Sequence, residues 1–372
     1  MRPHDIKLLP GSADPLPGSN MRKFIIIFYS ALAILMAGCS KDIDTKSPVS
    51  VDDAWMYDVS LPVPVLFASP DVQTKAPITA MKQNMNIGVF GFDMAAEQYS
   101  DEDDGMNMRN GLLVVDSKLR LNLKEPFYYP PSEDKSFRFY SYYPYADSYQ
   151  IGNDGKVSVE MNVATHLDIL WDREDGEKGF NAKLARGGRK PQFSYSHPAS
   201  CVSFYAEVDK LGTRTVIGNV TLIDVPIKAR LCVADIENSE NEGRFYEVAK
   251  RGDVIVSNGS TGNINVELST EPRQLGQDMF IYPDSGYLRL RVLLILGEEG
   301  KVSRVQADYV IKPEDLPEPE EGFLPGHHYK FNLKVLSASS DLTFTVTKDS
   351  EDKVLDFDNE FQWDDAFKGN AE

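Results

Sequence analysis

The stretch that decides the fold class runs over residues 323–333 and reads FLPGHHYKFNL. Its Pro-Gly pair at 325–326 predicts a tight turn, because proline fixes φ and glycine tolerates positive φ. After the turn, apolar side chains occupy every second position: Tyr329, Phe331, Leu333 and Val335. A period of two predicts a strand with one face on a hydrophobic core.

The same period of two recurs along the chain. The alternating segments are 119–123, 157–163, 264–268 and 342–346. Residues 288–296 are nearly all apolar, which predicts a central strand. Convincing amphipathic helices are few. Short strands separated by turn signals, such as Asn-Asp-Gly at 153–155, predict an all-β protein built of antiparallel β-sandwiches.

The length of the chain and the position of a Gly-rich segment predict two domains. A polar, Gly-rich segment at 172–190 is the candidate junction, which gives domains at 50–190 and 191–372. In the first domain, Phe137, Phe139 and Tyr142 are expected to line one core face. The segment LPVPVLF at 61–67 contains two prolines, which exclude a central strand and leave an edge strand or a bound extended arm.

The first fifty residues predict export. A basic start at 21–23 precedes an apolar run at 24–37 that is too short to span a bilayer and fits a secretory signal. Met-Ala-Gly-Cys at 36–39 resembles the lipobox of bacterial lipoproteins, so Cys39 is the expected lipidation site. Residues 1–20 are then an upstream extension, 21–38 the signal and 39–49 a lipidated tether.

Charge and cysteine content bear on the class of partner and on possible disulfide pairing. The chain carries 39 Lys and Arg against 57 Asp and Glu, a net charge of −18. An acidic chain gains nothing from phosphate neutralisation, so no nucleic-acid partner is expected. Besides Cys39, the chain has Cys201 and Cys232, both inside apolar strand-like runs. They could pair or remain buried thiols, and the sequence leaves both open.

Catalytic and metal-binding patterns are scarce. Adjacent residues on a strand point to opposite faces, so His327 and His328 are not expected to share a metal ion. His166 and His197 are expected to be structural. Arg-Gly-Asp at 251–253 is expected in a turn before the next strand. No nucleophile elbow, phosphate loop or dinucleotide fingerprint occurs, so we expect no enzyme, no cofactor and no metal.

Four segments together resemble the fimbrillin-like family of lipoproteins, which are subunits of type V pili. They are FLPGHHYKFNL at 323–333, NIGVFGF at 86–92 after a Thr-Lys pair at 74–75, SFRFYSYYP at 136–144 and FSYSHPAS at 193–200. The resemblance implies two transthyretin-like antiparallel β-sandwich domains in tandem. It also implies a lipid anchor in the outer membrane through Cys39 and a place at the cell surface or in the fimbrium.

The resemblance further implies assembly with other pilus subunits and binding to a host or bacterial surface receptor. Members of the family are trimmed near the N-terminus and polymerise by strand exchange. Here the removable strand would carry Val63, Val65, Leu66 and Phe67. The donor strand would come from the C-terminus, with the apolar anchors Val354, Phe357, Phe361 and Trp363.

One departure from the family pattern affects trimming. No arginine occurs between Cys39 and Arg109, so an arginine-specific protease could not cut the arm. We therefore expect cleavage near Lys75. Two alternatives stay open: a non-polymerising anchor that shares the fold, and a glycan-binding surface lipoprotein. The second would use an aromatic platform made from Tyr128, Tyr129, Tyr145 and Tyr149.

Overall fold

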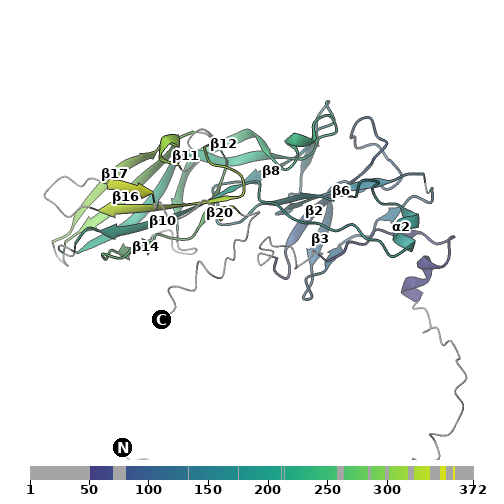
Figure 1. Cartoon of the computed structure of the whole chain (residues 1–372), viewed down its shortest axis with the longest axis horizontal. Coiled ribbons are helices and arrows are strands. Elements are labelled where there is room, and N and C mark those ends of the chain that lie inside the picture. Colours follow the sequence, from purple (N-terminus) through teal and green to yellow (C-terminus); the bar gives the residue numbers. More distant parts are fainter. Residues whose placement is uncertain are drawn as a thin grey trace, which may run out of the picture. The chain divides into compact units, whose positions relative to one another are not determined.

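The computed structural model describes most of the chain from residue 51 onward (Figure 1). The described residues are 51–69, 81–132, 134–174, 176–210, 212, 214–257, 264–283, 286–297, 301–316, 322–335, 344–348 and 355–356. Those from 52 on belong to one compact unit. This part of the chain holds one short α-helix, α2 (Ala182–Arg186), and the 3-10 turns η1 (Val51–Met56), η3 (Ser239–Asn241) and η4 (Pro313–Asp315).

All other regular structure is β. The strands of the first half are β1 (Val63–Pro64), β2 (Asn86–Asp93), β3 (Gly111–Val115), β4 (Leu121–Leu123), β5 (Tyr128–Tyr129), β6 (Phe137–Tyr143), β7 (Tyr149–Ile151), β8 (Val157–Asn162) and β9 (Leu170–Arg173). Those of the second half are β10 (Ser200–Val208), β11 (Thr215–Ala234), β12 (Phe245–Val256), β13 (Val266–Glu267), β14 (Arg273–Gln274), β15 (Met279–Ile281), β16 (Leu288–Leu296), β17 (Ser303–Ile311), β18 (His327–Val335), β19 (Phe344–Lys348) and β20 (Leu355–Asp356).

The strands form three larger sheets and one small ribbon. A five-stranded sheet has the order β4-β3-β2-β6-β9, and a seven-stranded sheet has the order β17-β16-β11-β8-β7 with β12 and β13 also on β11. A six-stranded sheet has the order β14-β10-β18-β19 with β15 on β10 and β20 on β18, and β1 pairs with β5. Among the described strands, only β10 and β18 pair in parallel. The predicted all-β sandwich class is confirmed.

Strand β11 pairs with strands from both halves of the chain. Its first half pairs with β16, and its second half pairs with β8, which precedes the predicted junction at 172–190. The register with β12 is interrupted between Leu222 and Val225, at Asp224, which has a φ of 52°. Such an irregularity lets one strand serve two sheet neighbours in turn. The domain boundary at residue 190 remains a prediction.

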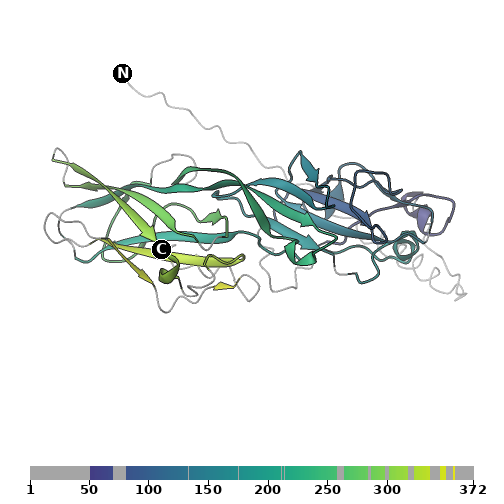
Figure 2. The same ribbon diagram turned by 90° about the horizontal axis from the view of Figure 1, so that it is seen from above.

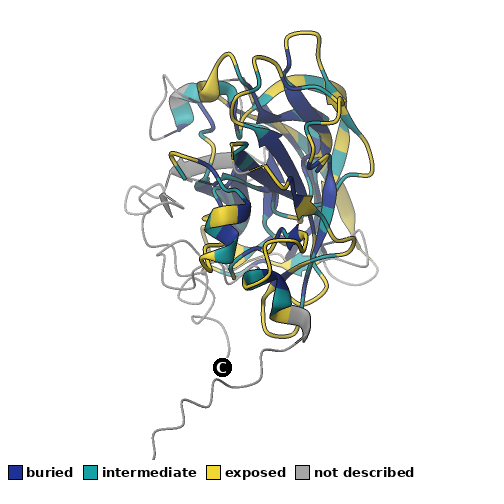
Figure 3. Ribbon diagram, turned by 90° about the vertical axis from the view of Figure 1, so that its right-hand side faces the viewer, coloured by how far each residue is buried: buried dark blue, intermediate teal, exposed yellow. Residues whose placement is uncertain are grey.

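In the described part of the chain, three large hydrophobic cores fill the space between the layers, and a small fourth cluster holds Ala199, Cys201 and Phe280. The first lies between the seven-stranded and six-stranded sheets, where β11 and β16 face β10 and β18 (Figure 2). The second packs Phe90, Tyr140 and Tyr142 of the five-stranded sheet against β8 and β11. The third lies on the opposite face of that five-stranded sheet. Its central strands β2 and β6 are therefore buried on both faces. Buried residues are dark blue in Figure 3.

Two of the strands expected from the sequence are confirmed, and two other expectations are wrong. β18 and β16 form where expected, and Tyr329, Phe331, Leu333 and Val335 share one core. The prediction for Tyr142 is wrong, because its ring lies in the second core while Phe137 and Phe139 lie in the third. The prediction of a turn at 251–253 is also wrong. These residues lie inside β12, where Arg251 donates to the Asp224 carbonyl oxygen.

Candidate functional site

The third core is completed by an N-terminal segment, residues 51–69, which we call the arm. Val63 and Val65 are each 2% exposed and Phe67 is 7% exposed, whereas Leu66 is 39% exposed. These values follow from the period of two, because alternate side chains of an extended chain point to opposite faces. Three of the four predicted strand residues thus point into the protein, and Leu66 points out.

Few backbone hydrogen bonds hold the arm. Val63 and Pro64 pair with Tyr129 and Tyr128 in the β1-β5 ribbon. Beyond it, the Val65 amide donates to the Phe127 carbonyl oxygen at 2.8 Å. The Ala68 amide donates to the Pro191 carbonyl oxygen, also at 2.8 Å. The two prolines at 62 and 64 lack amide donors, which keeps the ladder short.

Side-chain packing supplies most of the arm's contact. The Phe67 ring packs edge-on against Phe139, with centroids 5.3 Å apart, and stacks on Phe193 at 5.4 Å. Val63 and Val65 belong to the same buried cluster as Val89 of β2. Beneath the arm, burial raises the pKa of the Tyr129 and Tyr195 hydroxyls, so both stay neutral. The arm therefore rests on a largely apolar face.

A single arginine fastens the outer end of the arm. Arg186, the last residue of α2, donates from Nη1 to the carbonyl oxygens of Trp55 and Asp58, the latter at 2.7 Å. Its Nη2 donates to Val59 at 3.3 Å and to Leu61 at 2.9 Å. Charged donors make stronger hydrogen bonds than neutral ones. Arg186 thus satisfies four arm carbonyls that no β-ladder reaches.

Helix α2 is built to present this arginine. The Asn181 side chain accepts from the Leu184 amide at 3.0 Å and caps the N-terminus. Ala182 and Ala185 are buried in the arm's core, which fixes the face that the helix turns inward. Arg186 lies at the C-terminal end, where the helix dipole favours a positive charge. The apolar pattern at 61–67 pointed to the arm, but nothing in the sequence singled out Arg186.

Several predicted residues lie outside the described part of the chain. They are Cys39, Lys75, Val354, Phe357, Phe361 and Trp363. The short strand β20 (Leu355–Asp356) lies between two of them and pairs with His328 and His327 of β18. None of the helices in the described ranges has the length and hydrophobicity needed to span a bilayer.

The four tyrosines of the glycan alternative do not share one exposed face. Tyr128 is 46% exposed, but Tyr129 is 3% exposed and packs edge-on against Phe139. Tyr149 packs against Phe90 and donates its hydroxyl hydrogen to Asp101 at 2.7 Å. At least two of the four are therefore committed to packing.

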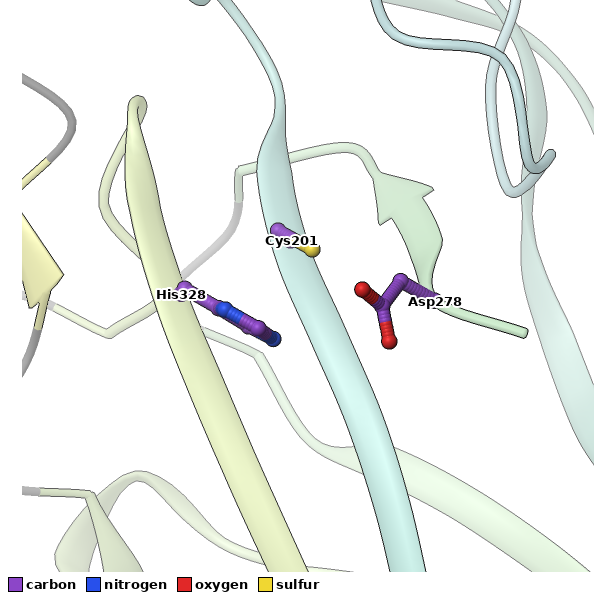
Figure 4. Close-up of side chains that lie close together, drawn as sticks. All are labelled: Cys201, Asp278 and His328. Atoms are coloured by element: carbon purple, nitrogen blue, oxygen red, sulfur yellow. The ribbon is translucent and has the colours of Figure 1, made fainter. Parts of the chain in front are cut away.

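A cluster of potential metal ligands lies on the six-stranded sheet. Cys201 on β10, His328 on β18 and Asp278 beside β15 point toward one another (Figure 4), with ligand atoms within 4.8 Å of each other. Register explains the first pair, because Cys201 and His328 are direct partners in the parallel pairing of β10 and β18. Cys201 and Cys232 are both buried free thiols, so they do not pair.

Burial governs the ionisation of this cluster. It raises the pKa of the Cys201 thiol and of the Asp278 carboxyl, and it lowers the pKa of His328 to about 3. Asp278 Oδ1 accepts from Ser203 Oγ at 2.5 Å and from Gln274 Nε2 at 2.8 Å. Of the other histidines, His197 lies 2.8 Å from Asp168, and His166 contacts the Asp278 carbonyl oxygen.

Comparison with known proteins gives partial likenesses in fold. No protein-family model and no curated protein matches the chain. A fimbrial protein from Bacteroides vulgatus has a TM-score of 0.49 and 15% identity over 76% of this chain and 98% of its own. Structures named as cell adhesion proteins score 0.47 at 14% identity (Bacteroides uniformis; 78% and 99% covered) and 0.43 at 14% (Bacteroides ovatus; 77% and 96%).

Proposed function

We propose that this protein is a structural subunit or adhesin of a cell-surface pilus, exported as a lipoprotein anchored through Cys39. In this proposal the arm is a temporary strand. Proteolysis near Lys75 frees it, and a strand from a neighbouring subunit takes its place. The observation that carries the proposal is the arm's mode of binding: deeply buried side chains at alternate positions, held by a short backbone ladder.

The burial of apolar side chains is a favourable term that another strand could supply in place of the arm. Burying Val63, Val65 and Phe67 contributes on the order of 5–9 kcal/mol before entropy is counted. This term opposes release of the arm after cleavage. An incoming strand with apolar residues at the same spacing recovers this term and can add main-chain bonds that the prolines forgo. We therefore expect the extra main-chain bonds to favour the assembled form.

Without an occupant, the five-stranded sheet would be unstable in water. The third core contains the apolar side chains Val89, Phe139 and Phe193 beneath the arm. Exposed apolar patches of this kind mark interaction sites or aggregation hazards. The proposal assigns the C-terminal segment of a neighbour, with Val354, Phe357, Phe361 and Trp363, as the natural occupant.

Trimming can be tested on assembled fibres. We expect a Lys75→Ala variant to keep its arm and stay unassembled, whereas Lys82→Ala, which alters the next lysine along, assembles normally. Mass spectrometry of fibre protein should show an N-terminus at Ala76. An intact lipidated N-terminus in wild-type fibres would reject the mechanism and favour the non-polymerising anchor.

A further inference from the structure

We propose that Cys201, Asp278 and His328 form a three-ligand zinc site on one face of the six-stranded sheet. The three residues come from three separate strands or strand ends, and their ligand atoms lie within 4.8 Å of one another (Figure 4). Zn–S and Zn–N or Zn–O bonds are about 2.0–2.3 Å long. The three donor atoms would therefore need to move only slightly closer together to surround one zinc ion.

The donor set matches zinc better than other common cations. A thiolate, an imidazole and a carboxylate are all established zinc ligands, and a thiolate disfavours magnesium and calcium, which prefer oxygen. Zinc requires no redox change at the site, so the metal binds by simple coordination. On binding, the Cys201 thiol releases its proton to solvent and forms the sulfur–zinc bond.

Neighbouring groups orient the ligands. Ser203 Oγ lies 2.6 Å from His328 Nε2 and donates to Asp278 Oδ1, so one hydroxyl contacts two of the three ligands. Gln274 donates to the same carboxylate oxygen, which leaves Oδ2 as the oxygen that we assign to the metal. Outer hydrogen bonds of this kind fix ligand geometry in metal sites.

Charge balance favours a dication. Thiolate and carboxylate together neutralise Zn²⁺, so the bound site adds no net charge to a buried region.

The test uses the purified full-length chain and cobalt as a spectroscopic probe. We expect the wild type to hold one zinc per chain by mass spectrometry of the metal. With Co²⁺ in place of zinc, it should show a thiolate-to-cobalt charge-transfer band. Cys201→Ser should lose this band. Cys232→Ser, which removes the other buried thiol, should keep it. A folded wild type without the band, or a band that follows Cys232, would overturn the proposal.

A second variant guards against misfolding. Asp278→Asn keeps both the thiol and nearly the same volume. We expect it to weaken zinc binding by at least the 10–100-fold typical of outer-shell changes. Added zinc should raise the Tm of the wild type but not that of Asp278→Asn at the same concentration. Equal rises in Tm would show that zinc binds elsewhere, and would contradict the assignment.

Discussion

Two neighbouring arm residues, Phe67 and Leu66, differ in what they contact. Phe67 packs against Phe139 and Phe193, whereas Leu66 is 39% exposed. Phe67→Ala should cost about 3–5 kcal/mol, the range for a buried phenylalanine, and Leu66→Ala should stay within about 0.5 kcal/mol. Urea unfolding of the two variants measures the difference. Equal losses would mean that the arm does not bind through alternate side chains.

Gly88 in β2 leaves room for a neighbouring tyrosine. A Cβ atom there would lie 2.1 Å from the Tyr142 ring, whose hydroxyl donates to Asn110 at 2.5 Å and cannot easily move. Gly88→Ala should therefore destabilise the fold by about 1–3 kcal/mol or more through overpacking. Gly212→Ala is the control, since a Cβ at Gly212 meets nothing within 4 Å. A neutral Gly88→Ala would show that Tyr142 has another rotamer available.

At the scale of elements, Arg186 on α2 is expected to control how often the arm opens. It bonds four arm carbonyls, and charged hydrogen bonds are worth about 1.5–3 kcal/mol. Arg186→Gln should speed hydrogen exchange at the Val65 and Ala68 amides by about 10–150-fold.

The exposed Arg189, three residues further on, supplies the matched control for this exchange experiment. Arg189→Gln should leave both arm amides unchanged. Exchange in β16, which lies in another sheet, should change in neither variant. Unchanged arm amides in Arg186→Gln would mean that apolar packing alone sets the opening rate.

Elements with an unbroken period of two could be predicted from sequence. β18 forms as expected because one buried face dictates its pattern. β16 also forms as expected, but it was predicted from a nearly continuous apolar run rather than from alternation. The second half of β11 could not, because Asp224 and Pro226 interrupt its alternation where it passes from β16 to β8. The face on which Tyr142 lies could not be predicted, because β6 is buried on both faces. An apolar residue in such a strand can take either face.

At the scale of the whole molecule, sites assembled from distant segments were hardest to predict. The pattern at 61–67 pointed to the arm because its signal is local. The Cys201–Asp278–His328 cluster carries no local signal, since only sheet pairing brings its residues together. Arg186 carries none because its partners in the arm lie 125 or more positions earlier in the sequence. Adjacent residues on a strand point to opposite faces, so the residues that lie beside His328 come from distant strands rather than from its neighbour His327.

The net charge of −18 also acts on the molecule as a whole. If copies assemble as proposed, they must approach against mutual repulsion, which salt screens over a Debye length of about 10 Å at 0.1 M. The assembly rate of arm-trimmed protein should therefore rise with sodium chloride, as followed by light scattering. Sucrose at matched osmolality is the control and should not reproduce the rise. A rate that falls with salt would instead mean that complementary charges at the contact outweigh the overall repulsion, and that recognition between subunits is electrostatic rather than apolar.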